Sequence, residues 1–300
     1  MILTVTLNPA LDVTYGVPAL VPGTSHRAAV RGSRAGGKGI NVARVLHQLG
    51  HEVLATGVLA GDVGEAIARD LGASGVPHDF VRARTGASRT TVTVVDDSLD
   101  DATVLNEPGP VLADLDWNAF TARYATYRPQ VVVLAGSLPP GLPADAYAQL
   151  YAMTEAECLV DATGPALVEA ARAGADVLLP NAAETHEATG HDDPARAAAA
   201  LVAYGAKAVV VSLGADGLLA VTPERSWRAY APERLRGNPT GAGDALAAAL
   251  AATTGLPWPA RIVEAIAWSA AAVPMPLAGE VDLPTLERIR SEVVVHEQEG

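Results

Sequence analysis

The chain has 300 residues, 49% of them hydrophobic, which is enough for one large domain or two ordinary ones with a sizeable core. Its formal net charge of −13 argues against nucleic-acid binding, because no basic stripe is available to neutralise a phosphate backbone. No apolar run reaches the roughly 18–20 residues of a membrane span, and the N-terminus lacks the features of a secretory signal, so we expect a cytoplasmic protein with no membrane partner.

The first 110 residues predict short strands around one long helix. Residues 2–7 are an apolar run typical of a buried strand, whereas residues 13–34 mix β-branched residues with prolines and glycines, which indicates short strands outside the core. The amphipathic stretch 40–49 predicts a helix that ends at Gly50. Other elements are expected at 53–60 (strand), 65–71 (helix), 88–95 (strand) and 102–106 (strand). The last two form a hairpin that, with residues 13–34, predicts a small sheet standing off the core.

From residue 115 the pattern becomes regular, and short apolar strands alternate with helices. This alternation is typical of a parallel sheet that helices cover on both faces, so the predicted fold class is α/β. Helices are predicted at 115–127, 143–153, 165–173, 194–204, 243–253, 259–272 and 284–292. Strands are predicted at 131–135, 158–161, 177–179 and 208–212, with a hairpin at 218–221 and 226–230.

Polar or glycine-rich residues follow several of the predicted strands. Ligands of an open parallel sheet bind at the carboxyl ends of its strands, so these residues should converge on one crevice. They are Asn8 and Asp12 after 2–7, Gly136 and Ser137 after 131–135, Asn181 and Glu184 after 177–179, and Ser212 and Gly214 at the end of 208–212.

Two glycine-rich turns each lead into a predicted helix. In the stretch 237–244, Gly241 and Gly243 permit a backbone path that a side chain would block, and the amino end of the following helix attracts anions. Asp244 in the first helical turn fits either a structural cap or a base beside an anion site.

The run Gly36-Gly-Lys-Gly39 is not a Walker A loop, since no Ser or Thr follows the lysine. It fits an anion-binding turn or a flexible turn with an exposed lysine.

Taken together, the motifs resemble those of the ribokinase-like PfkB carbohydrate kinases, and within them the 1-phosphofructokinase and tagatose-6-phosphate kinase branch. The resemblance covers essentially the whole chain. It implies a three-layer α/β/α fold with a mainly parallel central sheet, as a single kinase domain over 1–300 with a discontinuous β lid at about 12–35 and 87–107. The motifs are Thr6-Leu-Asn-Pro-Ala-Leu-Asp12, Gly36-Gly-Lys-Gly-Ile-Asn-Val-Ala43, Ser88-Arg89, Asn106-Glu-Pro-Gly-Pro110, Gly136-Ser-Leu-Pro-Pro-Gly141, Pro180-Asn-Ala-Ala-Glu184, Ser212-Leu-Gly-Ala-Asp-Gly217 and Thr240-Gly-Ala-Gly-Asp244.

The resemblance implies roles for the residues around ATP. Asp244 would be the catalytic base, with Gly241, Ala242 and Gly243 as an anion hole for the phosphoryl group. Glu184 would act on Mg²⁺ through water. Nucleotide-binding residues would be Asn181, Ser212, Gly214, Gly217, Asn238 and Thr240. Structural readings stay open for two of them, because Ser212 could merely end a strand and Gly217 could serve a hairpin.

The same resemblance implies a sugar-phosphate site. Asp12, Gly37, Lys38, Asn41 and Ser137 would line the sugar pocket. Arg89 would hold the phosphate of the substrate, and Arg27 could contribute to that site from a second subunit of a homodimer formed through the lid. A solvated strand face is the alternative for both arginines. The implied reaction is ATP-dependent phosphorylation of fructose 1-phosphate to fructose 1,6-bisphosphate, with tagatose 6-phosphate or fructose 6-phosphate as rival substrates. A catalytically weak sugar- or nucleotide-binding protein on this fold is the alternative of a different class.

Overall fold

The computed structural model describes residues 1–99 and 101–299, and its largest element is a ten-stranded sheet in the order β14-β13-β12-β11-β10-β9-β8-β1-β4-β5. The seven strands from β11 to β5 in this order are parallel, and the three at the other edge are antiparallel. The parallel strands are β1 (Ile2–Thr6), β4 (Val53–Leu59), β5 (His78–Arg82), β8 (Val131–Ala135), β9 (Glu157–Asp161), β10 (Val177–Leu178) and β11 (Val209–Ser212). The antiparallel strands are β12 (Leu218–Val221), β13 (Arg225–Tyr230) and β14 (Val294–Glu299).

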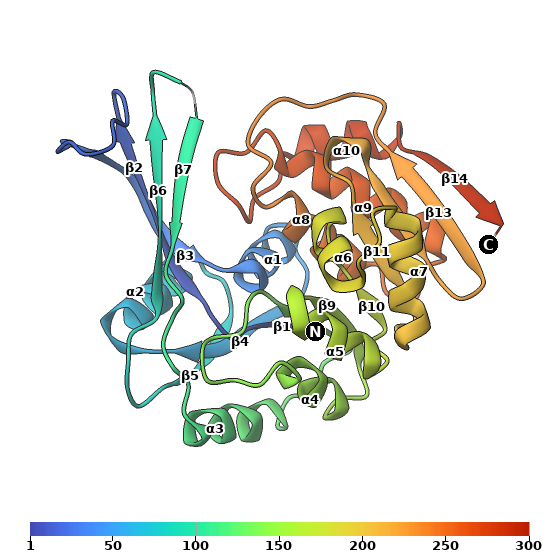
Figure 1. The fold of residues 1–300 in the computed structure, drawn as a ribbon, viewed down its shortest axis with the longest axis horizontal. Helices are drawn as coiled ribbons and strands as arrows, with labels where there is room; N and C mark the ends of the chain where they lie inside the picture. The colour runs from blue at the N-terminus through green and yellow to red at the C-terminus, as the bar shows by residue number, and fades with distance from the viewer. Residues whose placement is uncertain (100, 300) are drawn as a thin grey trace.

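Helices cover both faces of this sheet, as Figure 1 shows. One face packs against α1 (Lys38–Gln48), α2 (Gly61–Ala73), α8 (Ala242–Ala252), α9 (Trp258–Ala272) and α10 (Leu283–Arg290). The other packs against α3 (Asp114–Tyr124), α4 (Ala146–Ala152), α5 (Gly164–Arg172) and α7 (Pro194–Tyr204). Strand residues alternate between the two cores: Val133 of β8 points to the first, and Val132 and Leu134 point to the second. The predicted three-layer α/β/α fold with a mainly parallel sheet is therefore confirmed.

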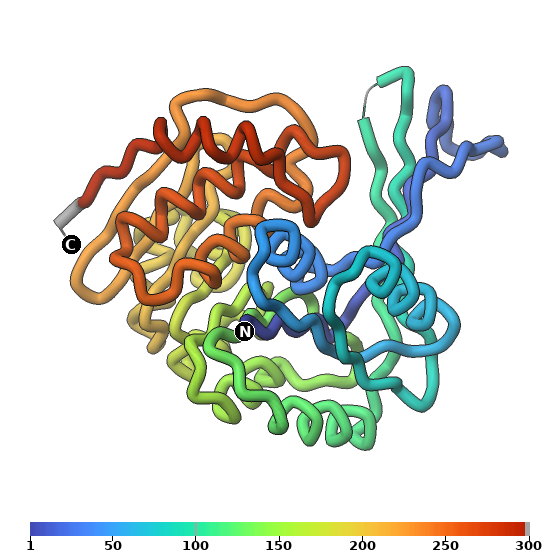
Figure 2. Tube along the Cα trace, turned by 180° about the vertical axis from the view of Figure 1, so that it is seen from behind, coloured from blue at the N-terminus to red at the C-terminus, as the bar shows by residue number. Residues whose placement is uncertain are grey.

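A second, four-stranded sheet projects from the core like an arm (Figures 1 and 2). Its strands, in spatial order, are β3 (Ala29–Gly36), β2 (Ala10–Val17), β6 (Arg89–Asp96) and β7 (Asp101–Asn106). The β2–β6 pair is parallel and the other two pairs are antiparallel. Strand β2 follows β1 closely, and β3 leads through Gly37 into α1. The small sheet is therefore attached to the core at the carboxyl end of β1 and the amino end of α1. The turn of the predicted hairpin, between strands 88–95 and 102–106, includes position 100, which lies outside the described residues.

Among the described residues, two strands, one α-helix and a short 3-10 helix at Gly214–Asp216 were not predicted. Within that part of the chain, β5 pairs only with β4 and β14 only with β13, and each carries polar residues that obscure an apolar alternation. Helix α6 (Ala182–Thr189) is set by a capping box, in which Asn181 and Glu184 each accept from the backbone N–H of the other. In the described part of the chain, no helix is long and apolar enough to cross a membrane.

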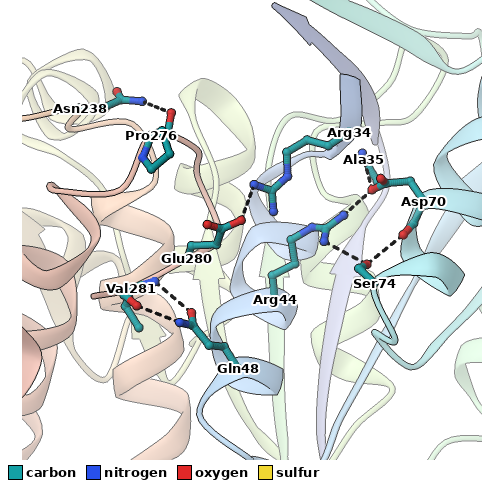
Figure 3. A network of polar contacts seen from close by, with 10 residues as sticks. All are labelled: Arg34, Ala35, Arg44, Gln48, Asp70, Ser74, Asn238, Pro276, Glu280 and Val281. Carbon is teal, nitrogen blue, oxygen red and sulfur yellow. Dashed lines mark hydrogen bonds and ion pairs between the residues drawn. The ribbon is translucent and has the colours of Figure 1, made fainter. Parts of the chain in front are cut away.

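Polar contacts fasten the base of the small sheet to the core (Figure 3). Arg34 of β3 donates to Glu280, in the loop between α9 and α10, at 2.9 Å. Asp70 of α2 accepts from the backbone N–H of Ala35 at 2.8 Å and from the guanidinium of Arg44 of α1. These contacts hold the β3–α1 junction, and therefore the amino end of α1, in place.

Candidate active site

The turn before α8 needs glycine for two reasons. Gly241 has a φ of 91°, a left-handed conformation that residues with a side chain rarely adopt. A Cβ atom there would also lie 2.8 Å from the Cα of Ala278, so no side chain fits. Helix α8 begins at Ala242 without a capping side chain, and the first N–H groups of a helix have no partner within it. The predicted anion-attracting helix end is thus present in the structure.

Asp244 lies in the first turn of α8 and is almost completely buried. Its Oδ2 accepts a hydrogen bond from Nδ2 of Asn41, on α1, at 2.8 Å. Burial raises the pKa of this carboxyl to about 7, and the charges of Asp161 and Asp12 add to that effect, while the Asn41 bond and Lys38 oppose it. A carboxyl that titrates near neutral pH can accept a proton and later release it, as a general base must.

Lys38, at the first position of α1, connects two carboxylates on neighbouring elements. Its Nζ donates to Oδ1 of Asp161 at 2.6 Å and lies 3.7 Å from Oε1 of Glu184. Burial alone would lower the pKa of Lys38, but the two carboxylates raise it overall, so the side chain stays charged. The lysine is therefore a fixed positive charge in the crevice and not a freely moving surface group.

Asp161 is a site residue that the sequence analysis missed. It is the last residue of β9 and is 4% exposed, and burial raises its pKa although Lys38 opposes the shift. A signal was available in the sequence, because Asp161 ends an apolar strand, just as polar residues end or follow the neighbouring strands. The rule about carboxyl ends of parallel strands applies to it equally.

A cavity of about 770 Å³ lies between the small sheet and the carboxyl ends of the parallel strands β1 and β8. Its lining includes Asn8, Gly37, Lys38, Arg89, Asn106, Glu107, Ser137 and Glu184. Arg89 begins β6 and donates through Nε to the carbonyl of Asn8 at 3.1 Å. Among the described residues, no hydrogen bond engages its two terminal nitrogens, so they are available to a ligand in the cavity. Burial lowers the pKa of Arg89, and the charges of Asp12 and Glu107 oppose this.

Asp12 and Asn41 belong to the Asp244 cluster and not to the lining of that cavity. The Asp12 carboxylate occupies the space where a side chain on Gly36 would be, because a Cβ there would lie 1.8 Å from Oδ2. Burial raises the pKa of Asp12, against the charges of three arginines, of which Arg89 contributes most. Of the seven predicted substrate residues, four therefore line the cavity and two, Asp12 and Asn41, lie near Asp244.

Arg27 is the seventh, and it lies elsewhere. It is exposed in the connection between β2 and β3, outside the cavity lining. A contribution from Arg27 to a neighbouring subunit stays a prediction.

The predicted nucleotide residues fall into two groups. Asn181, Ser212 and Gly214 line a second cavity of about 470 Å³, and Asn181 forms a parallel bridge with Ser212. The others make structural contacts around turns. Asn238 donates to the carbonyl of Pro276 at 3.2 Å and accepts from the N–H of Thr240 at 3.0 Å. A Cβ on Gly217 would lie 2.0 Å from the carbonyl oxygen of Ala229, so this glycine is required by the β12–β13 hairpin whatever else it does.

Comparison with known proteins relates most of the chain to one family of enzymes. A family model described as "pfkB family carbohydrate kinase" matches residues 6–272. A protein named 1-phosphofructokinase from Rhodobacter capsulatus is 38% identical over 85% of this chain and 84% of its own length. Another of that name from Xanthomonas campestris is 40% identical over 83% of each chain. The crystal structure of phosphofructokinase-2 from Escherichia coli in complex with potassium superposes with a TM-score of 0.91, at 27% identity, over 97% of this chain and 98% of the other.

Proposed function

The chain belongs to the pfkB family of carbohydrate kinases, and on that basis we propose that it transfers the γ-phosphoryl group of ATP to fructose 1-phosphate, giving fructose 1,6-bisphosphate. As a kinase of this family it transfers phosphate to a hydroxyl group of a sugar. Two curated relatives named 1-phosphofructokinase, each about 40% identical over most of the chain, support the choice of substrate.

One observation carries the choice of a phosphorylated sugar over a free one. The guanidinium of Arg89 lines the cavity of about 770 Å³, which we call the sugar-side cavity, and no hydrogen bond within the described residues engages its two terminal nitrogens. A planar guanidinium can bind two phosphate oxygens at once, which makes it a strong and directional anchor. Lys38 lines the same cavity and adds a second positive charge. A ketohexose held by its phosphate at this end would present its far primary hydroxyl toward Asp244.

In the proposed reaction Asp244 acts as the base. Its carboxylate takes the proton of the primary hydroxyl while that oxygen forms a bond to the γ-phosphorus. The bond from the γ-phosphorus to the bridging oxygen breaks, and ADP leaves with those electrons. The amino end of α8 and the Lys38 ammonium stabilise the negative charge on the transferred group. The Asn41 hydrogen bond orients the carboxylate and stabilises its charged form.

Glu184 fits a Mg²⁺ that arrives with ATP. One carboxylate oxygen caps α6, whereas the other lies 3.7 Å from Lys38 Nζ and keeps capacity to accept from a water molecule. No group of three His, Cys, Asp or Glu side chains in the described residues is arranged to hold a metal by itself. Mg²⁺ retains much of its water and uses substrate phosphates as ligands, so a single carboxylate reached through water suits it. When bound, the ion neutralises charge on the phosphates.

An assay of ADP release with each candidate sugar tests the proposal. We expect the highest kcat/KM with fructose 1-phosphate, compared with tagatose 6-phosphate, fructose 6-phosphate and unphosphorylated fructose. Arg89→Ala should raise KM for the sugar phosphate by about 100-fold, because a charge-assisted bidentate contact is lost, whereas Arg84→Ala is the matched control at an exposed position. Turnover of free fructose alone, or of none of the four, would contradict the proposal.

We further propose that two copies pair through the small sheet. The strand register places Val13, Val92 and Leu105 side by side across β2, β6 and β7, and Leu105 is 59% exposed. Asp12 lies on the opposite face, so one side of the arm is apolar and the other faces the sugar site. A second copy of the same apolar face is a self-complementary partner. Light scattering should report a dimer that Leu105→Asp dissociates and that Leu256→Asp, at an exposed position on the core, leaves intact.

A further inference from the structure

Asn8 stands at the meeting point of three segments of the sugar-side cavity. It follows β1 and is 4% exposed. Its Nδ2 donates to Oγ of Ser137 at 3.2 Å and to the carbonyl of Pro108 at 3.0 Å. Its backbone carbonyl accepts from Nε of Arg89 at 3.1 Å. The side chain itself thus has two partners, Ser137 and Pro108, and both line the cavity with it.

A backbone hydrogen bond from the N–H of Leu112 to the carbonyl of Pro140, at 2.9 Å, also joins the two segments that Asn8 connects. Ser137 lies in the turn after β8, and Pro108 lies in the irregular stretch between β7 and α3. The Leu112–Pro140 bond holds the two segments together at one point. The two bonds of the Asn8 amide fix Pro108 and Ser137 themselves, and both of these residues line the cavity.

Among uncharged side chains, only a carboxamide can make both bonds from one nitrogen. An amide NH₂ has two donor hydrogens, a hydroxyl has one, and a carboxylate has none. The reverse amide orientation would place Oδ1 against the carbonyl oxygen of Pro108, so the hydrogen-bond partners fix the orientation. Gly109, with a φ of 90°, closes over Oδ1, and a Cβ there would lie only 2.1 Å from that atom. The close approach of Gly109 shows that the 107–113 stretch is fitted to this side chain.

We propose that Asn8 is a positioning residue for the phosphate end of the sugar site. Its side chain fastens the segment after the small sheet to the Ser137 turn, and its backbone carbonyl holds Nε of Arg89, so that the Ser137 hydroxyl and the Arg89 guanidinium face one anion together. This inference rests on the proposed function for the identity of the sugar phosphate. Since Asn8 does not reach Asp244, its loss should weaken binding of the phosphorylated substrate and leave the phosphoryl-transfer step largely intact.

Steady-state kinetics of Asn8→Ala and Asn8→Asp test the inference. We expect KM for fructose 1-phosphate to rise about 10-fold or more in both, with kcat and KM for ATP within about 3-fold of wild type. The Asp variant should be the weaker binder, because it loses both donors and adds a negative charge near the phosphate. Gly109→Ala should reproduce the rise in KM from the other side of the contact. Tyr127→Phe is the control, because it removes a hydrogen bond of 2.7 Å to Asp79 far from the cavity.

The result separates this inference from the proposed function. If wild type turns over a sugar phosphate and the Asn8 variants show unchanged KM, or lose kcat and stability without a change in KM, the positioning role is wrong. If wild type turns over no sugar phosphate, the proposed function fails. The positioning role of Asn8 is then tested by calorimetry, as the binding of inorganic phosphate to the ATP-free protein. Weaker phosphate binding in Asn8→Ala than in Tyr127→Phe supports the role, and equal binding refutes it.

Discussion

Replacing Asp244 with Asn should make the protein more stable above neutral pH while reducing its turnover by orders of magnitude. The carboxyl is buried at the amino end of α8 beside Asp161, and these surroundings raise its pKa from 3.8 to about 7. An amide keeps the shape of the side chain and can still accept the hydrogen bond from Asn41. It cannot take a proton from a hydroxyl, so the proposed base is lost although the fold remains.

The size of the stabilisation follows from the pKa. Between pH 4 and 7 the folded protein holds a proton on Asp244 that the unfolded chain has released, so the stability of wild type falls as pH rises through this window and then levels. The pKa differs by about 3 between the folded and unfolded states, and each pKa unit corresponds to about 1.4 kcal/mol. Above pH 7 the charged carboxyl therefore lowers the free energy of unfolding of wild type by at most about 4 kcal/mol. With an unfolding entropy of about 2.1 cal/mol/K for each of 300 residues, this is about 6 °C in Tm.

Thermal melts of both proteins from pH 4 to 8, together with ADP-release assays, measure these effects. Asp244→Asn should melt close to wild type near pH 4 and several degrees higher at pH 8. The kcat/KM of wild type should rise with pH through an apparent pKa near 7, because the free enzyme needs a deprotonated base. A Tm difference that does not change with pH, or a variant less stable than wild type at pH 8, would refute the reasoning about burial. Near-normal turnover would refute the assignment of the base.

Three further substitutions address other parts of the site. Glu184→Gln retains the capping geometry of α6, so Tm should be unchanged. In a Mg²⁺ titration at fixed ATP, the Mg²⁺ concentration for half-maximal turnover should rise about 10-fold. An unchanged Mg²⁺ requirement would remove Glu184 from the metal site. Gly241→Ala should lower the free energy of unfolding, measured in urea, by about 2 kcal/mol or more, because the added Cβ clashes with Ala278 and the left-handed backbone is strained. Gly255→Ala is the control: Gly255 has a similar φ but open space around it, so only the backbone strain should lower the free energy of unfolding. Lys38→Met leaves the buried Asp161 without its cation and should lower the free energy of unfolding by about 1–3 kcal/mol at pH 8, a range reduced because the lysine is partly exposed. The loss should be smaller at pH 5, where Asp161 takes up a proton more readily. Urea unfolding at the two pH values checks this, and an equal loss at both would count against it.

Local sequence was sufficient for much of the fold. The alternation of apolar strands with helices predicted a parallel sheet covered on both faces, and glycines such as Gly50 marked where helices end. The elements that escaped prediction are those whose stability comes from one neighbour or from side-chain caps. Strand β14 exists because it pairs with β13, and α6 begins where it does because Asn181 and Glu184 cap it. Neither cause leaves a periodic pattern in the chain.

The sequence by itself determined the family, the strand ends where polar residues gather and the glycines at which a turn must form, because these depend on residue type and order. The tertiary structure alone decided which of those residues meet. Asn41 and Asp244 are 203 positions apart and share a hydrogen bond, and Lys38 pairs with Asp161 across 123 positions. The raised pKa of Asp244 and the two bonds of the Asn8 amide likewise arise from burial and packing, which sum contributions from segments far apart in the chain. No local pattern encodes such sums, so the chemistry of the site emerges only once the layers are assembled.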